Sequence, residues 1–243
     1  MLLIAHPGHE LHVFGWLAAT APRVCILTDG SGRAGAPRTQ YTHDLLEAAG
    51  AIRGAVFGSH SDAAIYRALL GRSHELFVGL AQEIAADIDE SAPSSVVTDA
   101  LTGYNPVHDL CRWIAGAALA MSGRRGIPQY EFSTAARVSG DGFRFELDAA
   151  AAGTKLAAAN AYAPLRAEVN ETLQQHGDEF VRVERFARVA DWTERDPFGG
   201  RAPDYERTGD ALVADGTYRE TIRFREHLLP VRDALCAAVE IHA

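Results

Sequence analysis

Short apolar runs alternate with stretches of helical periodicity along the first half of the chain, and this alternation constrains the fold most. The apolar runs cover residues 2–5, 23–28, 54–57 and 95–98. Helical periodicity follows over residues 7–19, 39–51, 74–88 and 106–121. Buried strands separated by helices are typical of a mostly parallel sheet with helices on both faces. We therefore predict an α/β protein with a doubly wound, mostly parallel sheet.

The second half of the chain has a different character. Strands are predicted over residues 129–132, 136–138, 143–147 and 180–189, with a hairpin turn at SGDG. An alanine-rich helix is expected over residues 150–175, and a C-terminal helix over 218–238. Residues 191–216 predict a long loop that could act as a lid. Because no clear linker interrupts the sequence, we predict a single domain over 1–243, with a core of 1–130 and a C-terminal extension of 131–243.

Composition narrows the classes of function. The 243 residues are 47% hydrophobic, enough for a full core, and their net charge of −9 disfavours nucleic acid or an anionic membrane as partner. No apolar run approaches the roughly 20 residues of a membrane span, and the N-terminus does not resemble a signal peptide. Cys25, Cys111 and Cys236 lack metal-type spacing and predict buried thiols of a cytoplasmic protein. We expect a small-molecule substrate, and a homo-oligomer is left open.

Histidines follow two of the predicted strands. His6 ends the first apolar run, His9 lies three residues later, and His108 lies near the start of a later helix. Because ligands bind beyond the carboxyl ends of parallel strands, the three imidazoles can meet at one point. Three protein ligands with one open position are typical of a catalytic zinc site. The alternative is that they are loop histidines hydrogen-bonded to the backbone.

Two motifs resemble those of the PIG-L/LmbE-like zinc-dependent N-acetylglucosamine deacetylases. That family has Ala-His-Pro-Asp-Asp-Glu after its first strand and His-Pro-Asp-His after a later one. Here residues 5–10 read AHPGHE and residues 105–108 read NPVH. The resemblance covers about residues 1–130 and extends to Lys155, Tyr162 and residues 184–186. It implies an LmbE-type Rossmann-like fold, a divalent metal that we expect to be zinc, and deacetylation of an N-acyl amino sugar or related small metabolite.

The resemblance assigns roles position by position. His6 and His108 match metal-binding histidines, and His9 falls where the family has its metal-binding aspartate. Gly8 stands in place of the general base, and Asn105 replaces a histidine that steadies the oxyanion. Asn105 can donate an N–H to an oxyanion but cannot protonate a leaving amine. We expect residue 8 to lie in a first helical turn that would tolerate Gly8→Asp.

Carboxylates near the same edge are the remaining acid–base candidates. We predict catalytic roles for Glu10 and Asp99, alongside Asn105, and note Asp29 and Asp109 as further candidates. Glu10 and Asp109 lie in first helical turns, where a carboxylate also favours the helix dipole, so a structural role is open for both. Asp99 directly follows a predicted strand.

Substrate contacts are predicted for Asp29, Arg38 and Tyr104. Arg38, with Asp62, falls near places where the family contacts sugar hydroxyls, and Tyr104 is next to Asn105. The leading function is therefore metal-dependent amide hydrolysis. The alternatives are another metal-dependent reaction on the same scaffold, such as a lyase or another hydrolysis, and a non-catalytic metal- or ligand-binding relative that lacks the base.

Overall fold

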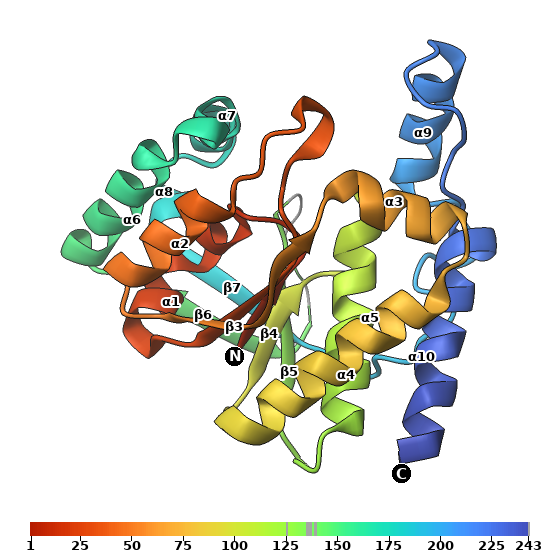
Figure 1. Cartoon of the computed structure of the whole chain (residues 1–243). Helices are drawn as coiled ribbons and strands as arrows, with labels where there is room; N and C mark the ends of the chain where they lie inside the picture. Colours follow the sequence, from red (N-terminus) through yellow and green to blue (C-terminus); the bar gives the residue numbers. More distant parts are fainter. Residues whose placement is uncertain (125, 135–137, 139, 243) are drawn as a thin grey trace.

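A seven-stranded sheet forms the centre of the molecule (Figure 1). The computed structural model describes residues 1–124, 126–134, 138 and 140–242. The strands are β1 (Leu2–Ile4), β2 (Arg23–Thr28), β3 (Ile52–His60), β4 (Val96–Asp99), β5 (Gln129–Phe132), β6 (Gly142–Glu146) and β7 (Val183–Arg188). Their order is β3-β2-β1-β4-β5-β7-β6; β1 to β5 run parallel, and β7 is antiparallel to β5 and β6. The predicted α/β, mostly parallel sheet is confirmed.

Helices cover both faces of this sheet. They are α1 (Phe14–Thr20), α2 (Thr39–Ala48), α3 (Asp62–Leu70), α4 (His74–Ser91), α5 (Pro106–Met121), α6 (Ala149–Ala161), α7 (Arg166–His176), α8 (Asp178–Arg182), α9 (Asp204–Ala214) and α10 (Leu229–His242). In β1, Leu3 packs into the core on the α4, α5 and α10 side, whereas Leu2 and Ile4 pack on the α1, α2 and α6 side (Figure 1). A strand that is buried on both faces must be apolar throughout, which explains the uninterrupted apolar sequence of residues 2–5.

The position of β1 determines where a ligand can bind. β1 lies between β2 and β4. The chain therefore adds β2 and β3 on one side of β1, and then adds β4 and β5 on the other side. Such a reversal of strand order opens a crevice at the carboxyl ends of the strands. The loops after β1, β2 and β4 all begin at this edge.

Four differences from the prediction concern helices. The expected helix over 150–175 is two helices, α6 and α7, joined by the 3-10 turn η3 (Ala163–Leu165), which contains Pro164. A proline ring cannot continue a helix interior. The expected loop over 191–216 contains α9, and α3 was not predicted. The predicted C-terminal helix begins later, with the π-helical turn η4 (Phe224–Leu228) preceding α10.

Two differences concern strands. The predicted strand over 180–189 begins as the short helix α8, and only then becomes β7. The strand predicted over 136–138 lies outside the described residues, apart from Val138, which is in no regular element. β6 pairs with β7 in an antiparallel arrangement that was not predicted, so this partner comes from about forty residues further along the chain.

A buried ion pair attaches the C-terminal half to the first helix. Lys155 Nζ lies 2.8 Å from Glu184 Oε1 and donates to the carbonyl of His12 at 2.9 Å. Glu184 accepts the backbone N–H groups of Gly15 and Trp16 at the start of α1, at 2.7 and 2.8 Å. Both charged side chains are fully buried, so each depends on the other for its counter-charge. The pair therefore fixes the start of α1.

Two further predictions concern cysteines and membranes. Cys25 and Cys111 are buried, Cys236 is half-buried, and all three are free thiols. Within the described ranges, no helix combines the length and the apolar character that crossing a membrane would need.

Candidate metal centre

Three histidine side chains meet at the carboxyl edge of the sheet. His6 follows β1, His9 begins the 3-10 segment η1 (His9–Val13), and His108 lies in the first turn of α5. The ring centroids are 5.2 Å apart for His6 and His9, 5.3 Å for His6 and His108, and 4.5 Å for His9 and His108. One ring nitrogen from each lies within 4.8 Å of the others. The loops after the neighbouring strands β1 and β4 bring them together.

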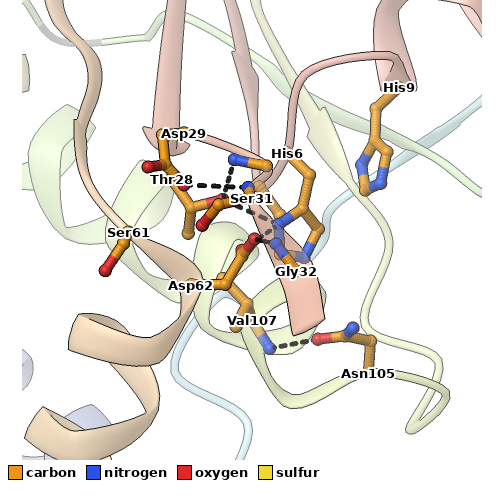
Figure 2. Close-up of polar contacts among 12 residues, drawn as sticks. His6, His9, Thr28, Asp29, Ser31, Gly32, Ser61, Asp62, Asn105 and Val107 are labelled. Atoms are coloured by element: carbon orange, nitrogen blue, oxygen red, sulfur yellow. Dashed lines mark hydrogen bonds and ion pairs between the residues drawn. The ribbon is translucent and has the colours of Figure 1, made fainter. Parts of the chain in front are cut away.

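The ring of His6 is held by groups from β2 and α3 (Figure 2). Its Nδ1 lies 2.8 Å from Asp62 Oδ1 and 2.8 Å from Thr28 Oγ1. Asp62 also accepts the backbone N–H of Gly32 at 2.5 Å. Burial alone would raise the pKa of Asp62, but the bonds from His6 and Gly32 outweigh it and hold that pKa below its ordinary value. Both close polar contacts of the ring are therefore made by Nδ1.

The unpaired Nε2 atom of His6 indicates a ligand site. His6 Nε2 is buried, and no hydrogen-bond partner for it exists in the part of the chain that the structure describes. Buried polar atoms are nearly always paired, so an unpaired one calls for an explanation. A metal ion bound through Nε2 supplies one, since metal-binding histidines commonly donate their other N–H to a carboxylate.

His9 is held in the same way by Asp99, at the end of β4. His9 Nδ1 lies 2.8 Å from Asp99 Oδ1, and Asp99 Oδ2 accepts the backbone N–H of Ala5 at 2.6 Å. Burial raises the pKa of Asp99, while the nearby imidazole of His108 acts in the opposite direction. Both oxygens of Asp99 are thus engaged, and the carboxyl orients His9 relative to the end of β1.

Burial favours the neutral form of two imidazoles in this cluster, those of His9 and His108. Burial lowers the pKa of His9 and His108 well below the ordinary value, and the neighbouring imidazoles lower both further. Neutral imidazole is the form that binds metal. Three nitrogen donors, two of them backed by carboxylates, fit a zinc ion with an open coordination position.

The space next to Gly8 is filled by an apolar side chain. Gly8 has φ +107°, in the left-handed region, and a Cβ there would overlap Cδ1 of Leu165 in η3. The ring of Tyr162 lies 3.7 Å from the same point. The expectation that Gly8→Asp would be tolerated is therefore wrong, because any side chain at residue 8 meets both backbone strain and a clash.

Glu10 holds the histidine loop together. Its Oε2 accepts the N–H of Gly8 at 2.7 Å, and its Oε1 accepts the hydroxyl of Thr42 at 2.6 Å. Thr42 in turn lies 2.9 Å from the hydroxyl of Tyr162. Burial raises the pKa of Glu10 to about 7. Both carboxyl oxygens of Glu10 therefore accept hydrogen bonds from the protein itself. These contacts give Glu10 a structural role in the loop.

Asn105 and Tyr104 lie beside His108. Asn105 is the N-cap of α5, and its Oδ1 accepts the N–H of Val107 at 2.8 Å (Figure 2). Its side chain also hydrogen-bonds to Tyr66, which partly offsets the rise that burial causes in the Tyr66 pKa. Tyr104 is 61% exposed, with its ring centroid 6.2 Å from that of His108. Tyr104 therefore borders the site.

The other two predicted acidic residues shape loops. Asp29 Oδ1 accepts the N–H of Ser31 at 2.9 Å. Asp109 is buried, and its Oδ1 accepts the N–H groups of Thr102 and Gly103 at 3.0 and 3.1 Å. Such side-chain bonds to nearby backbone stabilise turns. Neither carboxyl belongs to the three-histidine cluster.

Sequence reasoning missed the partner of His6. Asp62 directly follows Ser61, which caps α3 through a bond to the N–H of Ala64. The sequence contained this signal, because a serine-aspartate pair commonly starts a helix. Because α3 was not predicted, Asp62 had no precise predicted position relative to the histidines. Leu165 carried no signal, because its contact with Gly8 depends on how the C-terminal half folds back.

Comparison with solved structures shows proteins of the same fold. The conserved protein TT1542 from Thermus thermophilus has a TM-score of 0.57 and 17% identity, over 77% of this chain and 92% of that chain. The zinc-inhibited form of teicoplanin deacetylase Orf2 has a TM-score of 0.52 and 16% identity, over 78% of this chain and 99% of that one. The A40926 pseudoaglycone deacetylase Dbv21 has a TM-score of 0.51 and 21% identity, over 73% and 86%. No protein-family model and no curated protein matches the chain.

These similarities define the class of fold. Two of these structural neighbours, Orf2 and Dbv21, are deacetylases, and deacetylation is the activity of the LmbE/PIG-L family that the two sequence motifs resemble. The chain has the LmbE-type Rossmann-like fold that this resemblance implied. At 16–21% identity the likeness concerns the fold, and the chemistry must be argued from the site.

Proposed function

We propose that this chain is a metal-dependent amidohydrolase that deacetylates an N-acyl amino sugar or a related small metabolite. The observation that carries the proposal is the buried three-histidine cluster, in which carboxylates fix the Nδ1 atoms of His6 and His9. The fold supports it, because teicoplanin deacetylase Orf2 and Dbv21 share that fold. Orf2 was observed in a zinc-inhibited form, so a protein of this fold can bind zinc.

The proposed roles follow from the contacts. His6, His9 and His108 would hold the ion, and Asp62 and Asp99 position two of them. When bound, zinc acts as a Lewis acid and lowers the pKa of a coordinated water to about 7. This property makes a carboxylate base less necessary, which suits a site with glycine at residue 8.

Asn105 is proposed to contact the substrate carbonyl. Its Oδ1 is engaged by Val107 and its side chain bonds Tyr66, which leaves an amide N–H as the group that it can offer. A well-placed donor to a developing oxyanion contributes about 3 kcal/mol to catalysis. Tyr104, exposed at the edge of the site, is proposed to contact the bound substrate.

A second candidate function is supported by Leu165. Because this apolar side chain lies next to Gly8, where the resembling family has its general base in the sequence, the chain would also suit a relative that binds metal and ligand without catalysis. A third candidate is another metal-dependent reaction, such as that of a lyase or a different hydrolysis, which would use the same three histidines. These alternatives differ from the proposal in the product that they form, or in forming none.

Acetate release tests the proposal. Zinc-loaded and metal-free protein are incubated with N-acetylglucosamine and a panel of other N-acetyl compounds, and free acetate is measured. We expect zinc-dependent release that His108→Ala abolishes and His176→Ala, at an exposed histidine, leaves intact. Stoichiometric zinc binding without acetate release from any substrate would contradict deacetylation and favour the binding role.

A further inference from the structure

A cavity of about 540 Å³ lies at the opposite end of the sheet from the histidine cluster. It is formed by the last turn of α5, the loop from α5 to β5, the segment after β7 and the end of α10, near the C-terminus in Figure 1. His108 and Met121 are 13 residues apart in α5, which at 1.5 Å per residue separates the two sites by about 20 Å. Cavities of about 300–1,000 Å³ are typical of sites for small organic ligands.

Trp192 forms one wall of this cavity and packs against α5 at Gly116. A Cβ at residue 116 would lie 2.3 Å from Cγ and 2.6 Å from Cδ2 of Trp192. Glycine inside a helix is less favourable than alanine, and here the indole requires it. The indole is half-buried and lines the cavity, so part of the ring is open to a ligand. Such an aromatic wall favours a ligand with a flat ring.

Gln129, the first residue of β5, supplies a free hydrogen-bond acceptor. Its side chain lines the cavity, although the residue is only 6% exposed. Nε2 donates to the carbonyl of Arg112 at 3.0 Å, which fixes the orientation of the amide. Among the described residues, none donates a hydrogen bond to Oε1. This oxygen can therefore accept an N–H from a ligand in the cavity.

The described lining is basic, although the whole chain has a net charge of −9. It contains Arg124 and Arg188 against one carboxylate, Asp191. Oδ1 of Asp191 already accepts the N–H and the hydroxyl of Thr193, at 2.7 and 2.6 Å. Arg124 is engaged by Asp89, whose carbonyl accepts its Nη2 at 2.7 Å. Arg188 forms no ion pair with a carboxylate of the described residues, so its guanidinium is available to an anion.

We propose that this cavity binds a nucleoside monophosphate. The base stacks on Trp192 and donates an N–H to Oε1 of Gln129, and Arg188 forms paired, charge-assisted hydrogen bonds with the phosphate. A neutral sugar would not use the guanidinium, and inorganic phosphate would not use the indole. The inference goes beyond the proposed function, because no residue of the metal centre takes part in it.

Probes that divide the nucleotide into its parts test the inference. Metal-free protein is titrated by calorimetry with AMP, with adenosine, which lacks the phosphate, and with ribose 5-phosphate, which lacks the base. Arg188→Gln removes the cation, and Ala120→Trp fills the cavity from an exposed position of α5. Arg53→Gln is the matched control, because Arg53 is exposed on β3 and its loss removes the same charge elsewhere.

We expect wild type and Arg53→Gln to bind AMP about 10- to 100-fold more tightly than adenosine or ribose 5-phosphate. Arg188→Gln should bind AMP no more tightly than adenosine, and Ala120→Trp should lose AMP binding. If Ala120→Trp does not fold in a thermal melt, Arg188→Gln carries the same test. In NMR spectra of the indole N–H groups, AMP should shift the signal of Trp192 and leave the buried Trp16 and Trp113 in place.

Three results would overturn the nucleotide site. They are equal or absent binding of the three probes, AMP binding that Arg188→Gln and Ala120→Trp both retain, and AMP binding without a shift of the Trp192 signal. His108→Ala identifies binding at the metal centre instead: it should bind AMP like the wild type, and loss of AMP binding there would count against the cavity. None of these outcomes bears on acetate release, so the proposed function stands or falls separately.

Discussion

Leu165 occupies the space that a side chain at Gly8 would need. The leucine comes from the turn between α6 and α7, and the glycine from the loop after β1, so two segments distant in the sequence meet beside the loop that carries His6 and His9. An apolar group therefore lies next to the residue that replaces the family's aspartate. The same contact offers a way to return a carboxylate to the site without straining residue 8.

Leu165→Asp should increase acetate release from N-acetyl substrates. Aspartate has nearly the shape of leucine, and Leu165 is half-buried, so a carboxylate can be solvated there while facing the space beside Gly8. The increase is bounded by the factor of about 10² to 10⁴ that a positioned base contributes. Leu165→Asn is the matched control, since it has the same shape without the basic group. Equal rates for the two variants would exclude a carboxylate effect at this place.

Removing one histidine should remove the metal. Wild-type protein should bind about one zinc ion per chain, and His108→Ala should lose most of it, because two nitrogen donors do not hold zinc tightly. His176→Ala is the control, because His176 is exposed and far along the sequence in α7. Elemental analysis after dialysis checks this. Wild-type stoichiometry in His108→Ala would contradict the three-histidine centre.

Asp62→Asn and Asp99→Asn should each weaken zinc binding by about 10- to 100-fold without changing the stoichiometry at saturation. In each case an amide replaces the carboxylate that accepts the Nδ1–H of His6 or His9. The ring then loses the partner that fixes its tautomer. Competition with a chelator of known affinity measures the change. Asp44→Asn, on the exposed face of α2, should bind zinc like the wild type.

Asp109→Asn should stabilise metal-free protein at neutral pH. Burial raises the pKa of Asp109 to about 8, so the folded state holds a proton there that the unfolded state releases above its ordinary pKa of 3.8. The folded state therefore binds more protons between pH 4 and 8, and stability falls as pH rises by up to about 1 kcal/mol per unit. The amide keeps an acceptor for Thr102 and Gly103 and does not titrate. Denaturant unfolding at several pH values should show a flatter profile for the variant; parallel profiles would contradict the assignment.

The sequence predicted best where local rules decide the structure. The bounds of β2, α5 and β5 agree with those predicted, because apolar runs and Pro106 at the first position of α5 are local signals. The meeting of the three histidines was predicted too, since it follows from the parallel order of β1 and β4. Asp62 was missed because the helix that it starts was missed.

Residues whose roles depend on distant contacts were not predictable. Residue 8 was assigned to a helical turn, yet its φ of +107° and the nearby Leu165 depend on the path of the chain after α6. The engagement of both oxygens of Glu10 depends on Thr42 in α2, and no spacing in the sequence reveals it. A local sequence pattern cannot specify which side chains from distant segments of the chain will pack into a site.

The buried pair of Lys155 and Glu184 has a consequence for synthesis. The two residues fix the carbonyl of His12 and the first N–H groups of α1, immediately after His9. His6 and His9 leave the ribosome long before Glu184 is translated, so the start of α1 gains these contacts only after residue 184 has been made. The candidate metal centre therefore reaches its full geometry late in folding, when the C-terminal half packs against the first helix.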